Sequence, residues 1–260
     1  MPEEKEGLSP GERVGEQIWG TGYGELLRAI MNSYDPGFTE HIIAFFEHTY
    51  ARPALDIKTR QICTLCGLAA MGLAPEMALH FRGSLNLGWT QREIREAVLL
   101  TAFTAGIPKT INAFKVFHDV LAELKLPPET DPAPAREGDR HEKGMKRGTE
   151  LLGPSFEAVM KSAAEFNPDC ARHLAGEIFG VIMRRSRLTD RVRALIIIAA
   201  CTVNGNLTLL RTLLPGVAKA GVPKVEIAEI IYQMHGYAGW LTVLNAMDVF
   251  RGVFGGGGKG

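Results

Sequence analysis

Apolar residues along the chain recur three and four residues apart, and no stretch of useful length alternates apolar and polar positions. The segment 59–70 shows this helical pattern at Ile62, Cys63, Leu65, Cys66 and Ala69. Asp56 is placed to cap this helix and Gly72 to end it. The pattern predicts an all-α protein.

Three more helices are expected before residue 125. Pro75 opens one that runs to about Leu87 and stops at Gly88. A capping box at residues 90–93 starts another, which the segment 106–108 ends. The last helix carries apolar side chains at Ile111, Phe114, Phe117, Val120 and Leu121.

The two halves of the chain repeat each other at a fixed offset of 133 residues. The matched pairs include Gly15 with Gly148, Phe46 with Phe179, Arg60 with Arg193, Gly72 with Gly205, Gly88 with Gly221, Glu96 with Glu229, and Asn112 with Asn245. Because the matches run through both halves without a gap, they indicate duplication and fusion of one helical unit. The product is expected to be a pseudo-dimer with an approximate two-fold axis.

The boundaries of the two units follow from composition. Residues 126–139 are proline-rich and polar, which predicts an extended linker between a first repeat at 12–125 and a second at 140–254. The glycine-rich end, residues 255–260, has almost no side chains to pack and is expected to be disordered.

Charge and motifs narrow the function classes. The 260 residues carry 29 basic and 29 acidic side chains, so a nucleic-acid or anionic-membrane partner is not expected. No apolar run is long enough to span a membrane and the N-terminus is polar, which favours a cytoplasmic protein. Four cysteines make no disulfide framework, and no metal-binding or phosphate-binding motif occurs. We therefore expect no metal and no cofactor.

One polar cluster belongs to the first repeat alone. Glu76 and His80 lie four residues apart on one helix, with Arg82 close by, and a carboxylate beside an imidazole can raise its pKa and orient it for acid/base catalysis. The second repeat has Leu209, Leu213 and Pro215 at these positions. From spacing alone, a surface pair without consequence is an equal alternative.

Residues 12–125 resemble the carboxymuconolactone decarboxylase family, in the superfamily shared with the AhpD-type alkylhydroperoxidases. The resemblance is carried by residues 52–55, 59–60, 76–82, 86–90, 93–96, 105–108 and 112–114. It implies an AhpD-like helical fold, assembly into rings, and a pocket between protomers. It also implies cofactor-independent decarboxylase or isomerase chemistry on a small carboxylated or ketonic ring substrate.

The resemblance makes His80 the central acid/base residue, with Glu76 beside it. Arg82, Arg52 and Arg60 are then candidates to hold substrate carboxylates. Gln61 stands where the peroxidases have a glutamate and is included among the substrate contacts. His235 and Trp240 of the second repeat, near Tyr237, are expected to line the facing wall of the pocket, whereas Asn204, Asn206, His48 and Tyr50 are weaker candidates.

Two alternatives stay open. The first is an AhpD-like thiol peroxidase using Cys63 and Cys66, although these cysteines lie one helix before the family position and their apolar neighbours favour a place in the core. The second is a non-catalytic binding protein that retains the fold, which exposure of His80 to bulk solvent would support.

The tether between the repeats also predicts an assembly. If the fused chain replaces the dimer of the resembled family, a ring of six units needs three chains, so we expect a homotrimer.

Overall fold

The structure, a computed structural model, describes residues 7–132 and 139–255, and the regular elements within these ranges are all helices. The all-α prediction is confirmed. The elements of the first half are α1 (Pro10–Trp19), α2 (Tyr23–Met31), α3 (Pro36–Phe45), the π-helical η1 (Phe46–Tyr50), α4 (Ile57–Met71), α5 (Ala74–Asn86), α6 (Gln91–Leu99), α7 (Thr101–Thr104) and α8 (Ile107–Glu123).

The second half repeats this order. Its elements are α9 (Arg140–Leu152), α10 (Pro154–Phe166), α11 (Pro168–His173), the π-helical η2 (Leu174–Ile182), α12 (Asp190–Val203), α13 (Leu207–Lys219), α14 (Lys224–Gln233), α15 (His235–Ala238) and α16 (Trp240–Phe254). Helices α12, α13, α14 and α16 each begin 133 residues after α4, α5, α6 and α8. The tandem helical repeat read from the sequence is confirmed.

Local sequence signals account for the helix ends. The Asp56 side chain accepts a hydrogen bond from the Thr59 amide at 2.7 Å, and Thr90 forms the expected capping box with Glu93. The helix expected from there to Gly106 is instead two helices, α6 and α7. The break falls at Leu100, whose amide donates to the carbonyl of Ala97 and so tightens the last turn.

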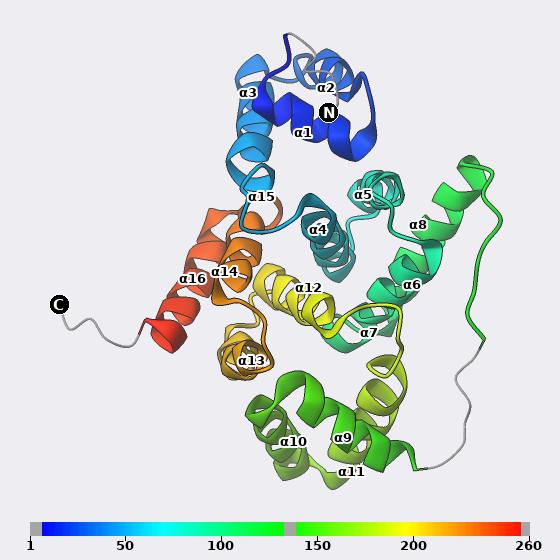
Figure 1. Cartoon of the computed structure of the whole chain (residues 1–260), viewed down its shortest axis with the longest axis vertical. Coiled ribbons are helices and arrows are strands. Elements are labelled where there is room, and N and C mark those ends of the chain that lie inside the picture. Colours follow the sequence, from blue (N-terminus) through cyan, green and yellow to red (C-terminus); the bar gives the residue numbers. More distant parts are fainter. Residues whose placement is uncertain (1–6, 133–138, 256–260) are drawn as a thin grey trace.

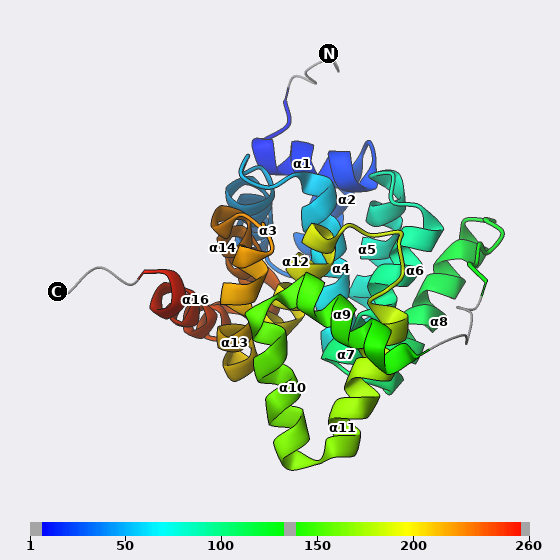
Figure 2. The same cartoon turned by 60° about the horizontal axis from the view of Figure 1, so that its bottom comes forward.

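Helices α4 and α12 pack against each other at the centre of the molecule, between α1–α3 and α9–α11 (Figure 1). Every residue from 59 to 70 of α4 and from 192 to 203 of α12 is buried. One apolar core therefore runs through both repeats, and a smaller second cluster lies among α1, α2, α3 and η1. The second view shows the other helices around the central pair (Figure 2).

Two buried ion pairs connect the repeats reciprocally. Arg60 of α4 pairs with Glu229 of α14 at 2.7 Å, and Arg193 of α12 pairs with Glu96 of α6. Arg193 is the 133-residue counterpart of Arg60, and Glu229 is the counterpart of Glu96. Such an exchange of equivalent contacts is what a two-fold interface produces, so the fused chain has the internal symmetry of a dimer.

The matched glycines Gly15 and Gly148 have the same structural purpose in the two repeats. A Cβ atom at Gly15 would meet the Tyr23 ring at 2.7 Å, and one at Gly148 would meet the Phe156 ring at 2.2 Å. Each glycine lets an aromatic side chain of the next helix lie against the first one. Conservation of this contact in both halves explains why the pair matches in the sequence alignment of the repeats.

Parts of two sequence predictions lie outside the described residues. Only residues 126–132 and 139 of the predicted linker are described, and they are not helical. The predicted disordered tail lies outside the described residues except for Gly255. Within the described ranges, no helix is both long and apolar enough to cross a membrane.

Candidate active site

His80 lies on α5 at the boundary between the two repeats. Its side chain is buried, with the residue 5% exposed. The ring makes edge contacts with Trp19 of α1 and with Tyr237 of α15, at centroid distances of 5.5 and 5.6 Å. Because Tyr237 belongs to the second repeat, both repeats form the surroundings of this histidine.

Burial determines the protonation state of His80. It lowers the pKa of the imidazole from 6.5 to about 3, so the ring is neutral at physiological pH. The buried Nδ1 atom has no hydrogen-bond partner among the described residues. The side chains of Gln61 and Ser84 donate instead to the main-chain carbonyl of His80, at 3.0 and 2.8 Å. They fix the backbone and leave the ring nitrogens available.

The expected pairing of Glu76 with His80 is not formed. Glu76 is exposed, and within the described part of the chain no hydrogen bond or ion pair joins it to His80. The two residues lie on the same helix, but Trp19 of α1 and Tyr237 of α15 cover the histidine, whereas the glutamate faces solvent. The predicted rise of the His80 pKa is therefore wrong, because burial lowers it without a compensating carboxylate.

A chain of buried polar groups leads away from the histidine. The Tyr237 hydroxyl shares a hydrogen bond with Tyr50 at 2.6 Å, and Tyr50 shares one with Thr64 at 2.7 Å. Gln233 donates to Thr64 at 2.7 Å and accepts from Arg60 at 3.1 Å. The network thus connects the His80 environment with the Arg60–Glu229 pair across the repeat boundary.

The tyrosines of this network are protonated acids at neutral pH. Burial raises the pKa of Tyr50 to about 12. Burial, followed by the effect of Tyr50, raises the pKa of Tyr237 well above its ordinary value. Both hydroxyls therefore remain hydrogen-bond donors within this network.

Two of the three arginines expected to bind substrate are paired within the protein. Arg60 is fully buried, and its three guanidinium nitrogens donate to Leu55, Gln233, Arg52 and Glu229. Because every guanidinium nitrogen of Arg60 is engaged in the repeat interface, its expected role in substrate binding is wrong. Arg82 is partly exposed and pairs through Nη2 with Glu123 of α8, so its role stays a prediction.

Arg52 retains an accessible edge. Its Nε and Nη2 atoms donate to the two carboxylate oxygens of Glu229 at 2.7–2.9 Å, while Nη1 makes no hydrogen bond to a described residue. The side chain is half exposed and lines two cavities, of about 300 and 460 Å³. Tyr50 lines the larger one, so this cavity reaches the polar network next to His80.

The aromatic residues of the second repeat divide into two groups. Tyr237 contacts His80, whereas His235 stacks on Trp240 at 4.1 Å and touches Phe45 at 5.2 Å. Phe45 also touches Tyr237, so Phe45 and Tyr237 stand between His235 and His80, and Trp240 lies behind His235.

Of the weaker candidates, Tyr50 belongs to the polar network described above, and the other three lie elsewhere. Asn204 and Asn206 lie at the turn between α12 and α13 of the second repeat, where Asn204 donates weakly to the carbonyl of Thr104. His48 is exposed, and so are His41, His118, His141 and His173.

Cys63 and Cys66 are core residues, as their apolar neighbours predict. Both are almost completely inaccessible, and burial raises the pKa of each thiol above its ordinary value. Thiol peroxidase chemistry requires an accessible, low-pKa thiolate, so this alternative loses its support. His80 is not exposed to bulk solvent either, which was the observation that would have favoured a non-catalytic protein.

Sequence reasoning missed Trp19, Thr64 and Gln233. A signal for them is present in the repeat itself, since their counterparts in the other half are Leu152, Ile197 and Leu100. Residues with a hydrogen-bonding side chain whose counterparts are aliphatic are candidates for a function that only one half performs. Within the described residues, no group of three His, Cys, Asp or Glu side chains is placed to hold a metal ion.

Comparisons with known proteins identify the family of this chain. The model of the carboxymuconolactone decarboxylase family matches residues 36–119 and 168–252. A 4-carboxymuconolactone decarboxylase of Acinetobacter baylyi is 30% identical over 100 residues, which are 38% of this chain and 75% of the relative. A nitrosuccinic acid decarboxylase of Metarhizium robertsii is 39% identical over 75 residues, 29% of this chain and 52% of the relative. The chain belongs to the carboxymuconolactone decarboxylase family, and it contains the family unit twice.

Proposed function

We propose that this protein is a cofactor-independent decarboxylase whose acid/base residue is His80 and whose substrate is a small carboxylated molecule. The relatives whose names state a reaction are both decarboxylases. The observation that carries the proposal is the buried, neutral His80, which has an unpaired Nδ1 and an edge contact with the Tyr237 ring of the other repeat.

The site suits the two steps of a decarboxylation, the loss of CO₂ and the protonation of carbon. The bond between the carboxylate carbon and the substrate carbon next to it breaks, and CO₂ leaves. The bonding electron pair is delocalised onto an adjacent electron-withdrawing group, where it forms an oxyanion. A neutral imidazole N–H or a tyrosine hydroxyl in a dry site can stabilise that oxyanion by hydrogen bonding. The carbanionic carbon then takes up one proton, which completes the product.

His80 is also the candidate for that proton transfer. A substrate carboxylate bound near the imidazole favours its charged form, so binding would raise the pKa of His80 from its low value in the free protein. The proton taken up by the ring is then available for the carbon. Arg52 could hold a carboxylate through Nη1 at the mouth of the cavity that Tyr50 lines.

Access requires movement of the aromatic side chains, since His80 is 5% exposed. Tyr50 and Tyr237 are the natural gate, because they separate the cavity beside Arg52 from the imidazole. Closure of such a gate over the substrate would exclude water from the reacting group.

The test is CO₂ release from 4-carboxymuconolactone and from nitrosuccinate, the substrates that the relatives' names state. His80→Gln should lower kcat at least about 100-fold, as expected for loss of a general acid/base. His48→Gln, which changes an exposed histidine of the same repeat, is the matched control and should retain activity. Undiminished turnover by a folded His80→Gln variant would refute the assignment.

We also propose a homotrimer in which three fused chains form a ring of six units. Equivalent positions at the beginnings of α8 and α16 expose large apolar side chains, at Ile107 and Trp240 and at Ile111 and Leu244. Leu241, beside this group, is 82% exposed. Apolar groups repeated on equivalent helices fit contacts between chains that follow the pseudo-sixfold arrangement.

A further inference from the structure

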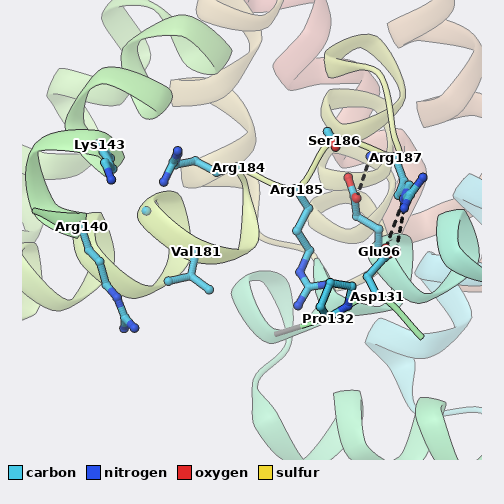
Figure 3. A pocket seen from close by; sticks show the side chains of 11 residues that line it. Glu96, Asp131, Pro132, Arg140, Lys143, Val181, Arg184, Arg185, Ser186 and Arg187 are labelled. Carbon is cyan, nitrogen blue, oxygen red and sulfur yellow. Dashed lines mark hydrogen bonds and ion pairs between the residues drawn. The ribbon is translucent and has the colours of Figure 1, made fainter. Parts of the chain in front are cut away.

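A cavity rich in cationic side chains lies where the second repeat meets α6 of the first repeat and the linker residues 131–132. It has a volume of about 420 Å³ and lies between α9, the end of η2 and the loop that follows η2 (Figure 3). Arginine and lysine side chains line it at Arg140, Lys143, Arg184, Arg185 and Arg187. The acidic side chains in the lining are Glu96 and Asp131, so positive charge exceeds negative charge.

The repeat symmetry shows why one of these arginines has no partner. Arg185 is the 133-residue counterpart of Arg52, whose guanidinium is held by both carboxylate oxygens of Glu229. The counterpart of Glu229 is Glu96. If the symmetry were complete, Glu96 would bind Arg185 in the same way.

Glu96 is engaged by other donors instead. One oxygen accepts from the Arg187 amide at 2.9 Å, and the other accepts from the Leu188 amide at 3.1 Å and from the Arg193 guanidinium. The main chain of the loop after η2 thus occupies the carboxylate oxygens that Arg185 would need. In the first repeat the equivalent loop leaves the carboxylate of Glu229 accessible to Arg52.

Arg185 is left unpaired in the cavity. Its Nε atom is buried and has no hydrogen-bond partner, and among the described residues no carboxylate lies within ion-pair distance of its guanidinium. Asp131, which is paired with Arg187, acts on Arg185 only through a longer-range electrostatic interaction. Neighbouring Arg140 and Arg187 are paired, with Glu177 at 3.0 Å and with Asp131 at 2.6 Å. Arg184 is exposed and, within the described ranges, likewise forms no ion pair. Leaving a partly buried guanidinium without an acceptor is unfavourable, and an anion in the cavity would remove that penalty.

We propose that this cavity is a binding site for a small oxyanion, a molecule bearing a carboxylate or phosphate group, and that Arg185 is its principal ligand with Arg184 as the second. A guanidinium offers two parallel N–H donors that match the oxygens of either group. The volume falls within the range of small-molecule sites. The cavity is lined by none of the residues around His80, so the site is separate from the decarboxylase site and does not depend on the proposed function.

Calorimetric titration of the full chain with inorganic phosphate and with succinate at low salt tests the proposal. We expect saturable binding of at least one of them, and Arg185→Gln should weaken it at least about tenfold, since a charge-assisted hydrogen bond is lost. Arg172→Gln removes an exposed arginine of α11 as the matched control and should leave the affinity unchanged. His80→Gln should also leave it unchanged, because the sites are separate.

The two probes distinguish the ligand classes: tighter phosphate binding indicates a phosphate-bearing ligand, and tighter succinate binding indicates a carboxylate. If Arg185→Gln fails to fold, Arg184→Gln takes its place and should weaken binding several-fold. Absence of saturable binding to the wild-type protein, equal affinity in the folded arginine variant, or loss of binding in His80→Gln would overturn the proposal.

Discussion

Glu229→Gln removes the carboxylate of the Arg60–Glu229 ion pair, one of the two buried pairs that connect the repeats. Glu229 is 4% exposed and accepts hydrogen bonds from Arg52 and from the fully buried Arg60. Glutamine preserves the shape but leaves Arg60 as a buried cation without a counter-ion. Breaking a buried ion pair in this way costs about 3–5 kcal/mol. For a chain of this size, that corresponds to a fall in Tm of about 10 °C.

The measurement is urea denaturation followed by circular dichroism, with wild type and variant at the same pH and salt. Asp169→Asn is the control, since the exposed Asp169–Arg172 pair should contribute less than about 1 kcal/mol. Glu96→Gln, the symmetry counterpart, should be at least as harmful because Glu96 also binds two main-chain amides. A loss below about 1 kcal/mol for Glu229→Gln would refute the view that the reciprocal pairs hold the repeats together.

The same pair should make stability depend on pH. Burial raises the pKa of Glu229, but the hydrogen bonds from Arg52 and Arg60 outweigh it, and the net pKa lies below its ordinary value of 4.5. Between the folded and unfolded pKa values the unfolded chain binds more protons than the folded one. The stabilisation is therefore complete above 4.5 and is lost as the pH falls through the lower, folded value. Glu229→Gln should lack this contribution.

Three further predictions test other parts of the description. The imidazole NMR signals of His80 should not titrate between pH 8 and 5, because burial places its pKa at about 3, and a midpoint near 6.5 would contradict the buried geometry. In the native protein, iodoacetamide should modify the exposed Cys170 and leave the buried Cys63 and Cys66 unmodified, as measured by mass spectrometry. Rapid modification of Cys63 or Cys66 would support the thiol peroxidase alternative. Light scattering should give a molar mass three times that of the chain, and Leu241→Asp, which places a charge at an exposed apolar position, should lower this measured mass. A stable wild-type monomer at micromolar concentration would exclude the trimer.

Most of the fold was predictable because its determinants are local or periodic. The Asp56 cap, the capping box at Thr90 and the glycine at the end of α4 act within a few residues, and the structure has each of them. The repeat was predictable because the offset is constant through every helix from α4 to α8. The break at Leu100 was not, since it depends on one main-chain hydrogen bond inside an otherwise continuous apolar pattern.

The candidate site was less predictable because its members come from distant segments. His80 could be selected, but helical spacing could not show that its own helix turns Glu76 into solvent while Trp19 and Tyr237 enclose the imidazole. Arg60 shows the same difficulty. Its chemistry suits a substrate carboxylate, and only the three-dimensional structure shows that Glu229, 169 positions away, already occupies it.

The two halves of the interface show what the second repeat contributes. The ion pairs that hold the repeats together are retained at both symmetry-related places, as Arg60–Glu229 and Arg193–Glu96. The groups around His80 are not retained, since Leu213 replaces the histidine and Thr104 stands opposite Tyr237 in the repeat alignment. Tyr237 nevertheless completes the surroundings of His80 from the second repeat. The second repeat has no histidine of its own at this position and instead supplies a wall to the histidine of the first repeat. The unpaired Arg185 lies in this half of the molecule, where the departure from the repeat symmetry leaves a cation and a cavity available for another ligand.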